Sequence, residues 1–226
     1  MNIVALAYPG FTLLDLIGPY TTLAEIPGAR PAIYWKTPGE IVTDSGVSIL
    51  AQRSFAEVPE EVEVLLVPGG GAGCLELLHD DEVLRWLGQV GQSARWVTSV
   101  CTGSLLLGAA GLLDGYQATS HWSMREELCR FGATPSPGRF VRDRNRLTGG
   151  GVTAGIDFGL ALATELAGEN VARAIALGIE YAPAPPFEAG TPEQAGPETV
   201  ARVLAHSSFR RPGTGRPQPE ETGQKG

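Results

Sequence analysis

The chain alternates short, mainly apolar runs with longer stretches whose apolar residues recur at helical spacing, and this alternation restricts the possible folds more than any other feature. The run at residues 3–7 is unbroken, and two further runs, at 62–67 and 96–100, are mainly apolar. Such runs are typical of parallel strands buried on both faces. Helical spacing follows the first run at 12–24 and the second at 80–92. We therefore predict an α/β fold, with a mainly parallel sheet, right-handed crossovers and helices on both faces.

The remaining elements are shorter, and they lead to an expected division of the chain into three parts. We predict strands at 32–35 and 116–119, hairpins over 41–50 and 139–148, and helices over 102–113, 122–130, 153–167 and 170–179. The segment 102–113 is apolar on nearly every side, which is typical of a buried helix. We expect one α/β domain over 1–190, a helical extension over 191–206 and a disordered tail over 207–226, where Gly and Pro recur and a single large apolar residue occurs.

Charge and cysteine content exclude several classes of protein. Lys and Arg total 17 against 25 Asp and Glu, a net charge of −8, which argues against binding to nucleic acid or to anionic membranes. Three cysteines cannot make a disulfide framework, and no Cys/His cluster has zinc-ligand spacing, so we expect no metal. The N-terminus lacks a basic signal region, and no apolar run reaches about 18 residues, so we expect a cytoplasmic protein without a membrane span.

Chemistry-bearing residues follow several of the predicted strands. Asp15 comes after the first strand, Gly69–Gly71 after the second run, Cys101 after the third, and Gly149–Gly151 after the late hairpin. Ligands of open parallel sheets bind beyond the carboxyl ends of the strands. We therefore expect these four features to lie near one another and to form a site.

Cys101 is the candidate nucleophile, because it lies where a buried strand turns into a buried helix. This is the arrangement of the nucleophile elbow in hydrolases. The start of a helix presents unpaired N–H groups and the positive end of the helix dipole, so we expect the thiolate of Cys101 to be favoured. The alternative is an inert core thiol, which is the interpretation we prefer for Cys74 and Cys129.

Two neighbours of this position have two interpretations each. Asp15 either complements the start of its helix or acts as a general acid and base beside the thiol. Thr102 either begins its helix or uses its N–H or hydroxyl to hold the substrate. The sequence around each residue leaves both interpretations open.

Four further residues are candidates for substrate or oxyanion binding. The backbone at Gly70 and Gly71 can approach a ligand without interference from a Cβ atom, as an oxyanion hole requires. Val152 follows the second glycine turn and is expected beside the substrate. His121 is either the base of a Cys101–His121 dyad or a residue that shapes the substrate site, and we prefer the second interpretation because no neighbour in the sequence fixes its ring.

Several motifs occur in an order that resembles one family. They are Leu14-Asp15-Leu16-Ile17-Gly18-Pro19, Val67-Pro68-Gly69-Gly70, Thr98-Ser99-Val100-Cys101-Thr102-Gly103, Ala118-Thr119-Ser120-His121-Trp122 and Leu147-Thr148-Gly149-Gly150-Gly151-Val152-Thr153-Ala154-Gly155-Ile156-Asp157-Phe158. Together they resemble the ThiJ/PfpI superfamily over residues 2–190. The resemblance implies a flavodoxin-like fold, similar to that of class I glutamine amidotransferases, and a homodimer. The motif at 180–187, Glu-Tyr-Ala-Pro-Ala-Pro-Pro-Phe, is similar to the isonitrile hydratase branch.

The resemblance also implies an activity. It makes Cys101 the nucleophile, Asp15 the acid/base partner and Thr102 a hydrogen-bonding residue in the cofactor-free hydration of an isonitrile to an N-substituted formamide, through a cysteine thioimidate. Peptidase-like members carry His after the nucleophile, where this chain has Thr102, so protease activity is not expected. AraC-type regulators add a helix-turn-helix module, which we do not expect in the tail.

Three other classes of function stay open. A glyoxalase-like or deglycase-like enzyme would use the same cysteine on small carbonyl compounds. A redox sensor would need only an exposed thiol of low pKa. A regulatory domain would bind its small molecule and leave it unchanged.

Overall fold

A seven-stranded sheet forms the centre of the chain. The computed structural model describes residues 1–206, so the tail predicted over 207–226 lies outside the described residues. The strand order is β10-β11-β7-β6-β1-β2-β5, and every neighbouring pair is parallel except β10 with β11. The strands are β1 (Asn2–Leu6), β2 (Arg30–Trp35), β5 (Arg53–Ser54), β6 (Val64–Val67), β7 (Trp96–Val100), β10 (Phe140–Asp143) and β11 (Arg146–Gly149).

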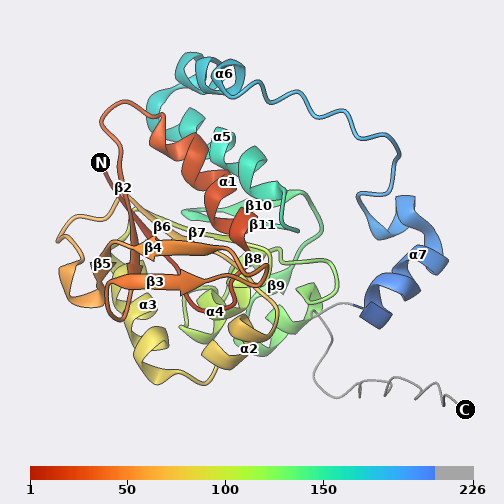
Figure 1. Ribbon diagram of the computed structural model, residues 1–226, viewed down its shortest axis with the longest axis horizontal. Coiled ribbons are helices and arrows are strands. Elements are labelled where there is room, and N and C mark those ends of the chain that lie inside the picture. The colour runs from red at the N-terminus through yellow and green to blue at the C-terminus, as the bar shows by residue number, and fades with distance from the viewer. Residues whose placement is uncertain (207–226) are drawn as a thin grey trace, which may run out of the picture.

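Helices cover both faces of this sheet (Figure 1). The first face carries α1 (Leu13–Ala24) and α5 (Ala154–Ala167), with α6 (Glu169–Gly178) packed against α5. The second face carries α2 (Ala72–Leu77), α3 (Asp81–Ser93) and α4 (Gly103–Ala109). The predicted α/β architecture, a mainly parallel sheet between two helical layers, is confirmed.

The smaller elements show where local sequence signals are incomplete. The hairpin of β3 (Gly39–Val42) and β4 (Ser48–Ala51) was expected. The sequence did not predict four elements: β5, α2, the 3-10 helix η1 (Phe55–Glu57) and the strand β9 (Thr134–Pro135). β9 pairs with β8 (Gln117–Ala118). The helix predicted over 102–113 ends at Ala109, since Gly111 adopts φ +74°. The helix predicted over 122–130 is a 3-10 helix, η2 (Arg125–Phe131).

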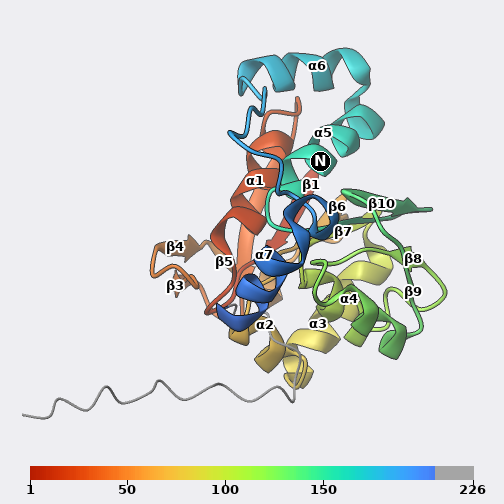
Figure 2. The same ribbon diagram turned by 90° about the vertical axis from the view of Figure 1, so that its right-hand side faces the viewer.

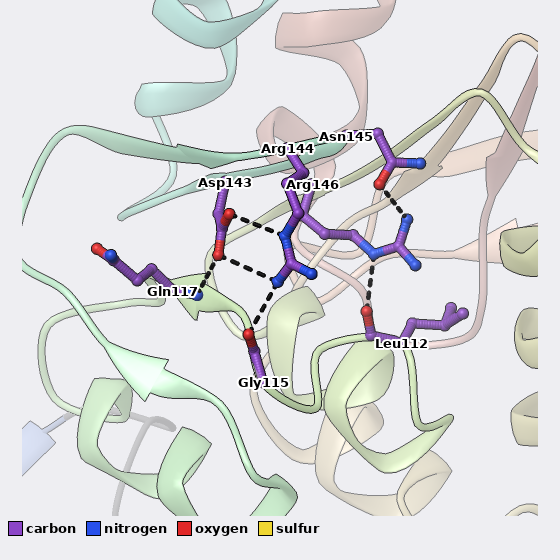
Figure 3. A network of polar contacts seen from close by, with 7 residues as sticks. All are labelled: Leu112, Gly115, Gln117, Asp143, Arg144, Asn145 and Arg146. Carbon is purple, nitrogen blue, oxygen red and sulfur yellow. Dashed lines mark hydrogen bonds and ion pairs between the residues drawn. The ribbon is translucent and has the colours of Figure 1, made fainter.

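Side chains of the β10–β11 turn hold this edge of the sheet to the loop that follows α4 (Figure 3). Arg144 donates through Nη2 to the Gly115 carbonyl at 2.8 Å, and Arg146 donates through Nε to the Leu112 carbonyl at 2.7 Å. The Arg144 guanidinium lies 3.5 Å from the centre of the Tyr116 ring. This network fixes β11, whose last residue, Gly149, leads into the site described below.

The C-terminal part of the described chain is an arm. It runs in an extended conformation from Tyr181 and then forms α7 (Pro192–His206), which has a non-helical residue at Gly196. Figures 1 and 2 show α7 outside the two helical layers, joined to α6 by the extended segment. The domain boundary at residue 190 stays a prediction. No helix within residues 1–206 is long and apolar enough to cross a bilayer.

Candidate active site

Cys101 occupies a strained elbow between β7 and α4. Its φ of +57° is unusual for a residue with a side chain. Its N–H donates to the carbonyls of Gly150, at 2.7 Å, and Gly149, at 3.1 Å, which fixes the turn. A Cβ atom at Gly103 would lie 2.3 Å from the Val67 carbonyl oxygen, so only glycine lets the chain turn this closely over β6. The predicted elbow geometry is present.

Asp15 reaches this elbow from the first turn of α1. The carboxyl is buried, and its Oδ2 accepts the Gly69 N–H at 3.0 Å. Its Oδ1 has no hydrogen-bond partner among residues 1–206, and the carboxyl lies close enough to the Cys101 thiol for each group to shift the pKa of the other. A Cβ atom at Gly69 would lie 2.9 Å from Oδ2 and 2.6 Å from the Thr102 nitrogen, so glycine is required for this close approach.

Burial controls the protonation of the acid–thiol pair. It raises the pKa of Asp15 to about 7, although the hydrogen bonds from Gly69 and Cys101 lower it. Burial also raises the pKa of Cys101 well above its usual range, and the charge of Asp15 raises it further, while the Thr102 N–H lowers it. Burial therefore opposes the thiolate that was expected at the start of the short α4 helix. Asp15 titrates near neutrality.

Thr102 connects the start of α4 to the glycine loop, residues Gly69–Gly71, through its side-chain hydroxyl. Its hydroxyl donates to the Gly70 carbonyl at 2.8 Å and accepts the Gly70 N–H at 3.0 Å. The predicted oxyanion role of Gly70 is not supported, because its N–H is already used by Thr102. Gly71 follows in the chain and directly precedes α2.

Two buried groups beside the site were not predicted to belong to it. Cys74 donates through its thiol to the Thr102 carbonyl at 3.3 Å, and burial raises the pKa of Cys74 to about 11. Tyr8, which follows β1, donates its hydroxyl to the Pro68 carbonyl at 3.0 Å. Tyr8 could have been predicted as a site residue from its position just after the first strand, because Asp15 was chosen for following the same strand.

His121 and Val152 lie apart from the acid–thiol pair and line a cavity of about 560 Å³, together with Gly151. The His121 Nδ1 is 2.8 Å from the Ser123 hydroxyl oxygen, and burial lowers the pKa of His121 to about 4. The imidazole is therefore neutral at neutral pH. This arrangement favours a role in shaping the cavity over the role of a base paired with Cys101.

The inner wall of this cavity contacts the backbone of Cys101. Ser120 donates its hydroxyl to the Cys101 carbonyl at 3.0 Å, and Gly150 accepts the Cys101 N–H; both line the cavity. The Cys101 side chain itself is 0% exposed. The cavity therefore lies against the backbone of the elbow, and Cys101 is not among its lining residues. Within residues 1–206 no group of His, Cys, Asp and Glu has an arrangement that could hold a metal ion.

Comparison with known proteins assigns the family. Residues 1–165 match the DJ-1/PfpI family. The chain belongs to this family. The sequence resemblance and the flavodoxin-like fold expected from it are thereby confirmed.

Individual DJ-1/PfpI proteins cover most of the chain. An isonitrile hydratase from Pseudomonas putida is 45% identical over 93% of this chain and 92% of that protein. The crystal structure of a ThiJ/PfpI family protein from Pseudomonas syringae superposes with a TM-score of 0.87 at 45% identity, covering 90% of this chain and 84% of that one. A deglycase from Thermococcus kodakarensis is 29% identical over 64% of this chain and 87% of that protein.

Proposed function

We propose that the chain is a cofactor-free lyase that hydrates an isonitrile, R–N≡C, to the N-substituted formamide. The observation that carries the proposal is the contact between the Cys101 thiol and a buried carboxyl, Asp15, whose pKa is about 7. A carboxyl with this pKa can accept and return a proton at neutral pH. The substrate class comes from the isonitrile hydratase that matches 93% of the chain.

The first half of the reaction forms a thioimidate. The Asp15 carboxylate takes the proton of Cys101 as the sulfur attacks the electrophilic terminal carbon of the isonitrile. Asp15 then gives this proton to the same carbon, which leaves R–N=CH–S attached to Cys101. The Thr102 N–H, which favours the charged sulfur, supports the attacking thiolate.

The second half consumes one water molecule. Asp15 takes a proton from water while the oxygen adds to the thioimidate carbon, and the nitrogen receives that proton. The resulting R–NH–CH(OH)–S adduct collapses when the carbon–sulfur bond breaks, and the hydroxyl proton returns through Asp15 to the sulfur. The products are R–NH–CHO and the Cys101 thiol. A single carboxyl serves each proton transfer, so the neutral His121 is not needed as a base.

The proposal includes a homodimer in the cytoplasm. Several large apolar side chains of α6 and the arm are exposed, among them Leu177 at 81% and Phe187 at 72%, and they offer surface for a second copy. The cysteines Cys74, Cys101 and Cys129 are unpaired, as expected in a reducing compartment.

The test is a product assay with two substrates. The protein is incubated with cyclohexyl isonitrile, and mass spectrometry follows loss of isonitrile and appearance of the formamide; a parallel incubation contains methylglyoxal. We expect formamide from the wild type and none from Cys101→Ala. Turnover of methylglyoxal alone would replace the proposal with the deglycase alternative, and formamide production by Cys101→Ala would refute covalent catalysis.

A further inference from the structure

The C-terminal arm returns to the cavity beside Cys101. Residues Gly190, Thr191, Pro192 and Glu193, at the start of α7, line the same cavity as His121. The other walls come from residues 119–122, Arg125, and residues 137–139 and 150–153. The arm therefore supplies the part of the wall that is most distant in sequence from the candidate nucleophile.

Hydrogen bonds at its beginning anchor the arm beside this cavity. The Tyr181 hydroxyl donates to Asp157 Oδ1 at 3.1 Å, and Asp157 also accepts Arg139 Nε at 2.7 Å. Arg139 itself lines the cavity. At the far end of the extended segment, Glu193 lines the same cavity as the oppositely charged Arg125 of η2. Between these points, residues 182–190 are exposed and extended.

Beyond its anchor at Tyr181, the arm has little contact with the rest of the domain. No side chain of residues 182–191 is buried, and the described contacts of α7 with the helical layers are few. Figure 2 shows α7 in front of the helical layers and separate from the central sheet. An element with so little buried surface can shift without disturbing the core.

The cavity has surfaces for an apolar group and for polar ones. Trp122, Pro137, Val152 and Pro192 are apolar lining residues, and Ser120, Thr153 and Thr191 are polar ones. A volume of about 560 Å³ admits a substituent of the size of a cyclic or aromatic ring. Since Ser120 and Gly150 line the cavity and hydrogen-bond with the backbone of Cys101, the cavity lies against the elbow that carries the thiol.

We infer that residues 190–193 are the specificity-determining wall on this approach, and that they set the largest isonitrile substituent that reaches Cys101. The inference rests on the proposed function for its substrate class. The inference also makes a claim that does not depend on the substrate class: the arm limits, by size, the access of any thiol reagent to Cys101.

The test measures access to Cys101 by alkylation. Iodoacetamide is the small reagent and N-phenylmaleimide the bulky one, and peptide mass spectrometry reports the labelling rate at each cysteine. The exposed Cys129 is an internal control for reagent reactivity. The obstructing variants are Thr191→Trp and Gly190→Trp; at Gly190 a Cβ atom would meet only Gln194 Oε1, at 3.7 Å.

A matched glycine supplies the control variant. Gly178, at the end of α6, also has space for a side chain, with nothing within 4 Å of a Cβ atom, and it does not line this cavity. We expect both obstructing variants to slow N-phenylmaleimide at Cys101 by about tenfold or more, as a single steric misfit in a binding pocket does. Iodoacetamide should change less than about twofold, and Gly178→Trp should change neither rate.

Two results would overturn the inference: wild-type rates of N-phenylmaleimide labelling in both obstructing variants, or equal slowing in Gly178→Trp. Isonitrile kinetics then separate the two proposals. If the wild type hydrates isonitriles, the obstructing variants should raise KM for cyclohexyl isonitrile more than for methyl isonitrile. If the wild type hydrates neither while the labelling pattern holds, the proposed function fails and the size-selective wall remains.

Discussion

At the scale of single residues, the candidate site is a thiol and a carboxyl that share one environment. Asp15 and Cys101 are both buried, and the charge of an ionised Asp15 makes ionisation of Cys101 more costly. The pair therefore carries at most one negative charge near neutral pH, and the proton resides on sulfur until a substrate arrives. Asp15 determines when the thiol can become a nucleophile.

The first prediction concerns Asp15→Asn. An amide cannot accept the thiol proton, so kcat/KM for isonitrile hydration should fall by about 10²- to 10⁴-fold. The wild-type kcat/KM should also decline below an apparent pKa of about 7, because protonated Asp15 no longer accepts a proton. Steady-state kinetics across pH 5–9 measure both effects. A variant that keeps the wild-type rate would assign proton transfer to another group.

The second prediction concerns stability at different pH values. Folding raises the pKa of Asp15 from 3.8 to about 7, so between these values the folded state binds more protons than the unfolded state. The free energy of unfolding therefore loses this contribution as pH rises through that window. Asp15→Asn should be more stable than the wild type at pH 8, by up to about 4 kcal/mol, and the difference should shrink towards pH 4.

Urea denaturation of both proteins at several pH values measures this difference. Cys101→Ser, which keeps the carboxyl, is the control and should retain the pH dependence. A wild type and an Asp15→Asn variant with parallel pH profiles would show that Asp15 has an ordinary pKa.

At the scale of elements, the site depends on how closely the ends of neighbouring elements approach. The β7–α4 elbow lies directly over the end of β6, and the glycine loop after β6 lies against both the elbow and α1. Gly69 and Gly103 make these approaches possible. The Thr102 hydroxyl then joins the loop to the helix with two hydrogen bonds.

The third prediction is that Gly103→Ala disrupts this elbow. The new Cβ atom would lie 2.3 Å from the Val67 oxygen, which is part of the backbone and cannot turn aside. We expect a loss of about 1–3 kcal/mol in the free energy of unfolding, together with loss of activity. The matched variant Gly178→Ala, in an open position of α6, should be neutral or more stable. Equal unfolding midpoints for the two variants would contradict this account.

At the scale of the whole molecule, the arm and α6 leave apolar surface uncovered. Leu177, Phe187, Val203 and Leu204 are all at least 40% exposed. The arm lines the candidate substrate cavity as well, so assembly and access to the site share one segment. The net charge of −8 opposes close association of copies, so apolar contact has to supply the attraction.

The fourth prediction is that the chain sediments as a dimer. A single chain has a mass of 23.8 kDa, and sedimentation velocity at micromolar concentration should give about twice this value. Leu177→Glu and Val203→Glu test the apolar surfaces, since a buried carboxylate would weaken the dimer. A mass of one chain at all concentrations would refute it.

The sequence by itself determined the α/β architecture and the position of the candidate nucleophile. The short, mainly apolar runs identified β1, β6 and β7, and the order of elements placed Asp15, Gly69 and Cys101 at one sheet edge. These signals are local. A parallel strand buried on both faces is apolar along its own length, so the sequence shows where it lies and where it ends. Ligands bind at the carboxyl ends of such strands, so the ends of the strands also indicate where a site lies.

Only the tertiary structure decided the chemical state of the site. The local sequence at Cys101 favours a thiolate, and the packing of α1, the glycine loop and α4 around it favours a thiol. Likewise, no local signal indicated that the arm lines the cavity with His121. Desolvation and shared cavities depend on which distant segments meet, so the residues around a group on the chain do not determine its protonation.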